Sequence, residues 1–425
     1  MSQTASEIER GAAPAPEPPV RGRSRPWDRR LLRAALDRLG RPPLAVRLWD
    51  GHWEAGEAGT EPRLRLAIAD RAALLGVLLD PEDRFGDLYS EGRIELVEGE
   101  LVDLLTTLYR HAPPDAAWRK PRRHLRRWLR SANGLRQARR NIHHHYDIGN
   151  RFYALWLDPH MQYTCAYFPE PGMSLEQAQV AKMEHICRKL QLCPGDRVVE
   201  AGCGWGGLAR YMAKHYGVHV TAYNISHEQV QYARQRALQE GLADRVHYVE
   251  DDYRNIQGEY DVFVSVGMLE HVGPKNYPTL GAVIDRCLTP EGRGLIHSIG
   301  RNRPRPMNSW IERRIFPGAH PPALREMMAI FESGGLSVLD VENLRLHYEE
   351  TLRHWLARFE ANVLEVRSLY DEAFVRAWRV YLSGSIAAFH CGELQLFQVV
   401  FARATNNRLP RNRAHLYRDP LPQDA

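Results

Sequence analysis

The sequence predicts an α/β protein, with helices on both faces of a doubly wound, mostly parallel sheet and a smaller α+β domain at the N-terminus. The chain has 425 residues, 44% of them apolar, enough for two or three domains with cores of their own. From about residue 141 onward, strand-like and helix-like segments alternate. A glycine-rich turn follows the first apolar strand of that series, as in nucleotide-binding α/β folds.

The regions at the two ends differ in composition from the rest. Residues 1–26 are rich in Pro, Ala, Glu and Arg with almost no large apolar side chains, so we expect a disordered tail. Residues 27–110 hold the apolar runs LAVRLWD and LRLAIAD and the helix-like LVDLLTTLY, a pattern typical of a small α+β domain. Residues 406–425 are expected to form a C-terminal tail.

Residues 111–140 are predicted to form a basic amphipathic linker. The chain's net charge is +5, yet residues 119–140 carry ten Lys or Arg and no acid, so the remainder is mildly acidic. Leu125, Trp128, Leu129 and Ala132 recur there at helical spacing. Two interpretations stay open, a solvated helix between domains or a helix on a membrane surface. A patch of this kind favours an anionic partner, either nucleic acid or phospholipid headgroups.

Cysteine and histidine spacing argues against a metal site. The six cysteines form no CxxC pairs, which disfavours zinc and a disulfide framework and fits a reducing cytoplasm. His143, His144 and His145 are consecutive and cannot easily converge on one ion, so no metal is expected. We also expect no signal peptide and no membrane span, because no apolar run approaches about 18 residues.

The segment 141–405 is predicted to form the larger domain. DRVVEAGCGWGG is a strand running into a glycine turn, and VHVTAYN, VHYVEDDY, YDVFVSVG and GRGLIHSIG are further strands. Helices are expected at LARYMAKHYG and HEQVQYARQRALQEGL, which alternate with the first strands. This order predicts a parallel sheet. LQLFQVVFAR is expected to be a late edge strand after a helical stretch at about 349–389.

The glycine turn indicates a site for a nucleotide-like ligand. Gly202, Gly204 and Gly206 let the backbone approach a ligand, although glycines at this spacing also occur in dinucleotide-binding folds. Glu200, at the strand end, can orient the ammonium of an amino acid, indirectly or through water. This favours S-adenosylmethionine over a nicotinamide.

The later strands offer candidates for the ribose and the adenine. A carboxylate for the ribose hydroxyls is expected about twenty residues after the turn. Asn224 stands there instead, so the amides of Asn224 and Gln229 are predicted to hold the ribose. Glu250 and Asp251 in VEDDY are candidates for the adenine, with an ordinary acidic loop as the alternative.

Four motifs together carry a family resemblance. HHHYDIGNRFYALWLDPHMQYTCAYF, VVEAGCGWGGLARYMAKHYGVHVTAYNISHEQ, SVGMLEHVGPKNY and LIHSIG resemble, in this order, the cyclopropane-fatty-acyl-phospholipid synthases, a family that includes the mycolic acid cyclopropane synthases. The resemblance covers about residues 80–402. It implies a class I methyltransferase (Rossmann-like) fold and S-adenosyl-L-methionine as methyl donor. It also implies methylene transfer to cis double bonds of unsaturated acyl chains in membrane phospholipids, giving cyclopropane fatty acids.

The chemistry of that reaction agrees with the resemblance. An isolated alkene is a weak nucleophile, so the sulfonium methyl must be presented to it in a dry, apolar slot. Attack leaves a carbocation, which aromatic faces stabilise by about 0.5–2 kcal/mol each. Ring closure then requires a base, and the resemblance implies a bound bicarbonate ion.

The resemblance also assigns the site residues. Cys165, Glu270, His297, Ile299 and Tyr348 match the bicarbonate-site positions of the family. Glu270 would accept the hydrogen bond of the bicarbonate OH, while His297 and Tyr348 would donate. Cys165 is then a weak donor in the pocket wall, neither nucleophile nor metal ligand. In the same stretch, Tyr163 and Thr164 are expected to contact the cofactor.

Other functions remain to be separated from this one. The same carbocation can yield a methyl-branched or methylene product, and Leu269, where many relatives have Phe, bears on the product more than on activity. A nucleic-acid methyltransferase and a noncatalytic lipid-binding protein are alternatives of other classes. We expect membrane phospholipids with unsaturated acyl chains as partners and no nucleic acid. The N-terminal domain is expected to bind lipid and form a homodimer. The expected location is cytoplasmic, peripherally on the inner face of the membrane.

Overall fold

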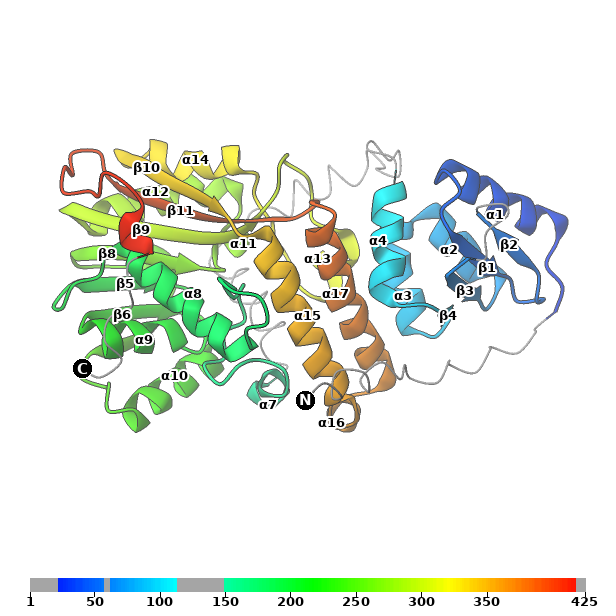
Figure 1. Ribbon diagram of the computed structural model, residues 1–425, viewed down its shortest axis with the longest axis horizontal. Coiled ribbons are helices and arrows are strands. Elements are labelled where there is room, and N and C mark those ends of the chain that lie inside the picture. The colour runs from blue at the N-terminus through cyan, green and yellow to red at the C-terminus, as the bar shows by residue number, and fades with distance from the viewer. Residues whose placement is uncertain (1–21, 57–61, 113–148, 418–425) are drawn as a thin grey trace. The chain divides into compact units, whose positions relative to one another are not determined.

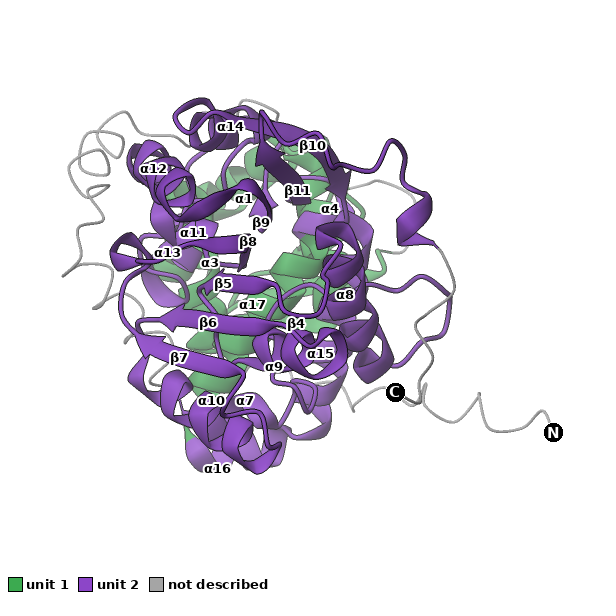
Figure 2. Cartoon of the chain, turned by 90° about the vertical axis from the view of Figure 1, so that its left-hand side faces the viewer, with its two compact units in different colours: residues 1–119, 370–387 green, residues 120–369, 388–425 purple. Residues whose placement is uncertain are grey.

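The computed structural model describes residues 22–56, 62–112 and 149–417. Its chain divides into two compact units, coloured differently in Figure 2. Unit 1 takes its described residues from 1–119 and 370–387, and unit 2 from 120–369 and 388–425. The predicted basic linker from residue 113 onward, the three consecutive histidines and most of the predicted N-terminal tail lie outside the described residues.

Unit 1 contains a four-stranded sheet of order β2-β1-β3-β4, in which β1 and β3 are parallel and the other pairs antiparallel. Its first helix starts at Pro26, one residue inside the predicted tail, where the carboxylate of Asp28 accepts the backbone N–H of Arg25 at 2.9 Å. The elements are α1 Pro26–Arg38, β1 Leu44–Arg47, β2 Trp53–Ala55, β3 Leu64–Ile68, α2 Arg71–Leu79, α3 Pro81–Ser90, β4 Ile94–Glu98 and α4 Leu101–His111.

A segment far along the chain completes unit 1. Residues 370–387, which include most of helix α17 (Glu372–His390), were expected in the larger domain but belong to unit 1. Arg376 explains this, because its guanidinium donates to the carbonyls of Tyr89 (2.6 Å) and Ile94 (3.2 Å). It also pairs with Glu95 at 3.0 Å and lies over the Tyr89 ring. The order of segments along the chain cannot show that a late helix packs with the N-terminal ones.

Unit 2 contains a seven-stranded sheet of order β10-β11-β9-β8-β5-β6-β7 (Figure 1). The five strands from β9 to β7 are parallel, and β11 pairs antiparallel with both β9 and β10. The strands are β5 Arg197–Ala201, β6 His219–Asn224, β7 Val246–Glu250, β8 Tyr260–Val266, β9 Leu288–Gly300, β10 Leu336–Asn343 and β11 Gln395–Arg403. The predicted doubly wound α/β fold is confirmed.

Two strand predictions need correction. Strand β11 is not at the edge, because β10 covers its outer side. Its continuous burial from Gln395 to Ala402 fits an interior strand. β10 itself was not predicted, since its LSVLDVEN sequence alternates weakly and is mostly half-exposed.

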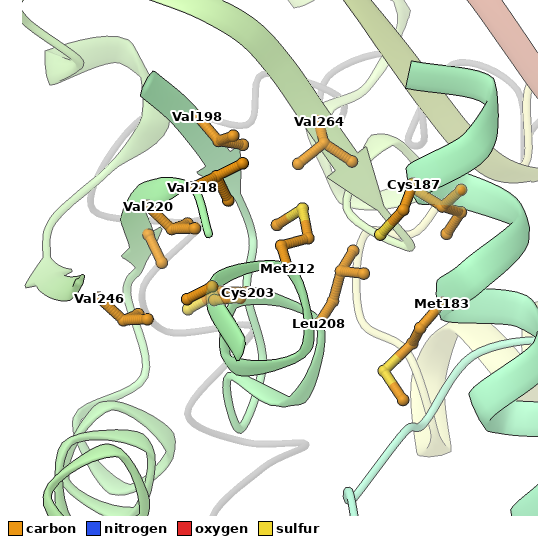
Figure 3. Close-up of a cluster of buried hydrophobic side chains, with 14 of the residues drawn as sticks. Met183, Cys187, Val198, Cys203, Leu208, Met212, Val218, Val220, Val246 and Val264 are labelled. Carbon is orange, nitrogen blue, oxygen red and sulfur yellow. The ribbon is translucent and has the colours of Figure 1, made fainter. Parts of the chain in front are cut away.

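Helices cover both faces of this sheet, and adjacent strand residues point to opposite faces. Val198 packs with Met183 and Cys187 of α8 and Leu208 and Met212 of α9 (Figure 3). On the other face lies a second cluster with Val199 and Phe263, against α12 and α14. The helices are α7 Asn150–Ala154, α8 Leu175–Leu190, α9 Gly207–Tyr216, α10 His227–Gln239, α11 Leu269–Val272, α12 Tyr277–Cys287, α13 Ser309–Arg314, α14 Leu324–Glu332, α15 Arg345–Ala361 and α16 Val363–Leu369. Short 3-10 turns are η1 Tyr253–Asn255, η2 Pro274–Asn276 and η3 Ala414–Leu416.

The predicted C-terminal tail packs on unit 2 as far as it is described. Arg413 pairs with Asp340 of β10, and Leu416 is buried, its carbonyl accepting from Arg188 at 3.2 Å. Among the described residues, no helix has the length and apolar character needed to cross a bilayer.

Candidate active site

A pocket opens at the carboxyl ends of the parallel strands β5, β6, β7 and β8, where α/β sheets bind ligands. Its empty volume, counted to where it opens to solvent, is about 1040 Å³. Of the predicted cofactor residues, the pocket is lined by Tyr163, Thr164, Glu200, Gly202, Gly204, Asn224, Gln229 and Asp251.

The glycine turn after β5 shapes the floor of the pocket. Gly202 has φ +84°, and a Cβ there would come within 2.7 Å of the Met268 side chain. Gly206 was predicted to contact the cofactor but does not line the pocket. Its missing side chain instead admits Tyr248, whose hydroxyl donates to the Gly206 carbonyl at 2.9 Å. A Cβ at Gly206 would lie 2.4 Å from that hydroxyl, so this glycine serves packing.

Glu200 supplies a buried carboxylate to the pocket. Its side chain is 2% exposed, and its Oε2 atom has no hydrogen-bond partner in the structure. Burial raises the pKa of Glu200 to about 7, against the opposing effect of Lys182 and Arg210. An orphaned buried acceptor of this kind fits a ligand that brings a donor or a positive charge, as the ammonium of an amino acid does.

The two predicted ribose amides are bonded to each other. Asn224 Nδ2 donates to Gln229 Oε1 at 2.8 Å and to the Gly204 carbonyl at 3.1 Å. Since Gln229 accepts through its oxygen, its Nε2 is the end that remains to donate to a ligand. Asn224 thus fixes the orientation of Gln229 and ties it to the glycine turn.

The acids after β7 separate into different roles. Asp251 lines the pocket and accepts from the backbone of Asp252 (2.7 Å) and from Asn255 (2.9 Å). Asp252 caps the η1 turn and pairs with Arg254 at 2.7 Å. Glu250, predicted to bind the cofactor, does not line the pocket. It points to solvent beside His227 at 2.8 Å, because it alternates with Asp251 along the chain.

A buried lysine that the sequence reasoning missed holds the pocket wall at Thr164. Lys182 of α8 is fully buried and donates to Thr164 Oγ1 at 2.9 Å and to Gln162 Oε1. Burial lowers its pKa to about 8. The sequence signal for it is a lysine among the apolar residues of LEQAQVAKMEHICRKL, a helix not predicted from the sequence. His271 also lines the pocket, and burial lowers its pKa to about 4.

None of the five predicted bicarbonate-site residues lines this pocket, but the structure brings two of them, Glu270 and Ile299, together beside it. The Ile299 backbone N–H donates to Glu270 Oε1 at 2.6 Å, and His297 precedes Ile299 by two positions on the same face of β9. Glu270 Oε2 and His297 Nε2 are both buried without a hydrogen-bond partner in the structure. Burial raises the pKa of Glu270 to about 7 and lowers that of His297 well below its usual value.

Cys165 and Tyr348 form the other part of the set, around the Leu344 carbonyl. The Cys165 thiol lies 3.9 Å from that oxygen, and the Tyr348 backbone N–H donates to it at 3.2 Å. Strand β11 links this part to the first, since Leu344 N–H donates to the Leu396 carbonyl and Leu396 pairs with Ile299. The thiol also lies 3.1 Å from the Ala166 carbonyl. Burial raises the pKa of Cys165, which keeps it a neutral thiol and a poor nucleophile.

An aromatic cluster connects the cofactor pocket with Tyr348. Tyr163 lines the pocket, and the centroid of its ring lies 5.2 Å from that of Trp156 and 5.3 Å from that of Trp355. Trp355 in turn lies 5.9 Å from Tyr348, edge to face. Leu269, by contrast, packs in the core against α12 and α14 and does not line the pocket, so it offers no side chain to this path.

The fold and the pocket together define a class I methyltransferase. The solved structure of the mycolic acid cyclopropane synthase CmaA1 complexed with SAH and CTAB matches with a TM-score of 0.59 and 28% identity, covering 62% of this chain and 98% of that one. The class I methyltransferase fold expected from the sequence is confirmed.

Sequence comparisons narrow the class to a family. The family model "Mycolic acid cyclopropane synthetase" matches residues 133–399, and the chain belongs to that family. The cyclopropane-fatty-acyl-phospholipid synthase of Escherichia coli (strain K12) is 45% identical over 266 residues, which are 62% of this chain and 68% of that protein. The probable fatty acid methyltransferase of Pseudomonas putida is 36% identical over 397 residues, 88% of this chain and 96% of its own length. The family resemblance seen in the sequence is confirmed.

Proposed function

We propose that this protein is a phospholipid cyclopropane synthase. It transfers a methylene group from S-adenosylmethionine to the cis double bond of unsaturated acyl chains in membrane phospholipids. The observation that carries the proposal is a pair of orphaned buried groups, Glu270 Oε2 and His297 Nε2, beside a pocket that suits S-adenosylmethionine. Its relative in Escherichia coli is named for this reaction.

The pocket fits S-adenosylmethionine at each end. Glu200 offers an unpartnered carboxylate oxygen for the amino-acid ammonium, and Gln229 offers a donor that Asn224 orients toward the ribose. The floor at Gly202 leaves room that a side chain would fill. When bound, this molecule supplies an electrophilic methyl group. The mycolic acid cyclopropane synthase CmaA1 was solved with SAH, the demethylated form of that molecule.

The aromatic cluster suits the cationic stage of the reaction. A carbocation on the acyl chain needs electron-rich walls that do not trap it covalently. Tyr163, Trp355 and Tyr348 provide a continuous path of ring faces and edges from the cofactor pocket. Each ring contributes about 0.5–2 kcal/mol to the stability of a nearby cation. The neutral Cys165 thiol fits the same requirement, because a thiolate would attack the cation.

The orphaned groups suit a small anion that carries one hydrogen. The carboxylate of Glu270 can accept the OH of bicarbonate, and His297 Nε2 can donate to one of its other oxygens. Bound bicarbonate would supply the base for ring closure. In the structure the Ile299 N–H already donates to Glu270. Ile299 therefore holds the carboxylate in place.

A second candidate is transfer of a methyl group to the same acyl chains with a branched or methylene product. The name of the Pseudomonas putida relative, a probable fatty acid methyltransferase, favours it, and that relative covers most of this chain. The two candidates share every residue of the cofactor pocket. They differ in the fate of the carbocation. Loss of a proton from the transferred methyl closes the ring directly, whereas a hydride shift before that loss gives a methylene product, and a saturated methyl branch needs a hydride donor as well.

The partners and location follow from the proposed substrate. We propose that the protein works on the cytoplasmic face of the membrane as a peripheral homodimer, drawing acyl chains from phospholipids into its own slot. The ten cations of residues 119–140 support this, because each basic side chain near an anionic surface contributes about 1 kcal/mol. Nucleic acid is not proposed as a partner.

Expression in a bacterium that makes unsaturated phospholipids but lacks cyclopropane lipids tests the proposal. Mass spectrometry should show phospholipids heavier by one CH₂, and fragmentation should place that carbon across the former double bond as a ring. A chain branched at one carbon would establish the second candidate. Unchanged lipids in cells that contain folded protein would contradict both.

A further inference from the structure

We propose that Gln398 is a positioning residue that fixes the tautomer of His297, and that Lys189 and Glu342 fix Gln398 in turn. All four side chains come from different elements of unit 2. Glu342 is on β10, Lys189 on α8, Gln398 on β11 and His297 on β9. They form one line of hydrogen bonds, here called the relay, that ends at His297, whose Nε2 has no partner in the structure.

The contacts along this line are all short. Lys189 Nζ donates to Glu342 Oε2 at 2.5 Å and to Gln398 Oε1 at 2.7 Å. Gln398 Nε2 lies 3.1 Å from His297 Nδ1. Gln398 is fully buried and Lys189 is 5% exposed. Water therefore does not compete for these groups, and each must be satisfied by the next.

Lys189 determines which atoms donate and which accept along this line of hydrogen bonds. An ammonium can only donate, so the end of the Gln398 amide that faces Lys189 must be its oxygen. The other end is then the NH₂ group, and it donates to His297. A nitrogen that accepts a hydrogen bond carries no proton, so Nδ1 of His297 is the bare nitrogen. In a neutral imidazole the proton is then on Nε2.

The environment keeps His297 neutral, which the tautomer requires. The ring is 1% exposed, and burial lowers its pKa well below the usual value, helped by the positive charges of Lys182 and Lys189. Glu342 acts in the opposite direction, but it is already paired with Lys189 and with His185 at 2.8 Å. His297 thus carries its one N–H at Nε2.

This arrangement gives the proposed anion site a hydrogen-bond donor at His297 in addition to the acceptor at Glu270. Because the role of His297 as a donor to bicarbonate rests on the proposed function, the tautomer matters for catalysis only if that function holds. The opposite tautomer would place a lone pair at Nε2, facing the oxygens of an anion, and would repel it. Glu270 already supplies the acceptor, so the site needs a donor on the other side.

Nitrogen-15 NMR of side-chain-labelled histidine tests the inference, because bare and protonated ring nitrogens have well-separated shifts. The His297 signals are assigned by their loss in His297→Asn. In the unaltered protein we expect a bare Nδ1 and a protonated Nε2. A protonated Nδ1 with a bare Nε2 would overturn the inference, and this measurement needs no variant of the relay to fold.

Gln398→Glu sharpens the test. A carboxylate can only accept, so Nδ1 should gain a proton, and the product yield per unit time should fall at least tenfold while S-adenosylmethionine affinity stays within about twofold. Gln395→Leu is the matched control, since Gln395 is on the same strand, is 5% exposed and bonds to Asn343 (2.9 Å) and Gly392 (2.8 Å) instead. It should leave the His297 shifts unchanged.

The outcomes separate this inference from the proposed function. If Nδ1 stays bare in folded Gln398→Glu, Gln398 does not set the tautomer and the inference fails. If the shifts behave as expected but the unaltered protein modifies no lipid, the relay stands and the proposed function fails.

Discussion

The two halves of the site differ in how they are built. The cofactor pocket is made by loops that follow consecutive strands, and its polar groups face an opening. Glu270 and His297 are both buried, and they are held by contacts among α11, β9, β10, β11 and α8. In the first half the side chains meet a ligand directly, whereas in the second they are held by other buried polar groups. Binding and catalysis should therefore be separable by substitution.

Glu270→Gln should have the largest effect. The amide keeps the shape but loses the negative acceptor, so we expect kcat to fall about 10²–10⁴-fold, the range for a lost acid–base group. S-adenosylmethionine affinity, measured by calorimetry, should stay within about twofold. Because burial raises the pKa of Glu270 to about 7, its ionised form costs stability at pH 8, and the variant should not melt earlier there.

Glu326→Gln is the control for that variant. Glu326 likewise accepts a backbone N–H, from Ala323 at 2.7 Å, but it caps helix α14. It should lower the melting temperature slightly and leave kcat within about twofold. Parallel losses of affinity and kcat in Glu270→Gln would mean that the two halves are not separable.

Gly202→Ala should weaken binding at the cofactor pocket. A side chain at φ +84° costs about 1–2 kcal/mol, and the new Cβ would contact Met268. We expect S-adenosylmethionine affinity to fall about tenfold or more, with kcat at saturating concentration much less changed. Gly241→Ala is the control, since it has φ +69° with no atom within 4 Å of the added Cβ and does not line the pocket. A similar affinity loss in both variants would mean that general backbone strain is responsible.

Glu200 should make cofactor affinity depend on pH. Its pKa of about 7 means that, without ligand, the carboxyl is neutral below that pH and must lose a proton to pair with an ammonium. Affinity should therefore weaken by up to about tenfold per pH unit below 7 and level off above it. Glu200→Gln should flatten that dependence. A pH profile that is the same in both proteins would remove Glu200 from ammonium binding.

Cys165→Ser should have the smallest effect. The buried thiol already lies near the carbonyls of Ala166 and Leu344, and a hydroxyl can donate to the same atoms. We expect kcat within about fivefold of the unaltered protein, measured on unsaturated phospholipid vesicles. Complete loss of activity, with an adduct on Cys165 in the unaltered protein, would show instead that the thiol attacks substrate.

The cofactor pocket could be predicted from the sequence better than the buried site of Glu270 and His297. The β5 turn could be predicted because Glu200, Gly202 and Gly204 are close in the chain, and apolar strands with alternating helices define the sheet. Gly206 and Glu250 do not line the pocket, and spacing in the sequence cannot distinguish a glycine that faces Tyr248, or an acid that faces His227, from one that faces a ligand. The anion-site residues came from the family resemblance alone.

The buried relay could not be predicted, because its members are up to 209 residues apart. A polar residue such as Gln398 within the apolar run LQLFQVVFAR is a visible signal, but its partner is set by strand β11 lying between β9 and β10. We predicted β11 at the edge of the sheet, which is wrong, because the sequence of a strand does not show which other strands pair with it. The return of residues 370–387 to unit 1 was missed for the same reason.

The most direct test of the central claim is transfer of a deuterated methyl group. Purified protein would be given S-adenosylmethionine with a fully deuterated methyl and vesicles of unsaturated phospholipid, and the lipids analysed by mass spectrometry and proton NMR. We expect a cyclopropane ring that keeps two of the three deuterium atoms, because one is lost to the base held by Glu270 and His297. An exocyclic methylene, which also keeps two deuterium atoms but contains no ring, or no transfer at all, would contradict that claim.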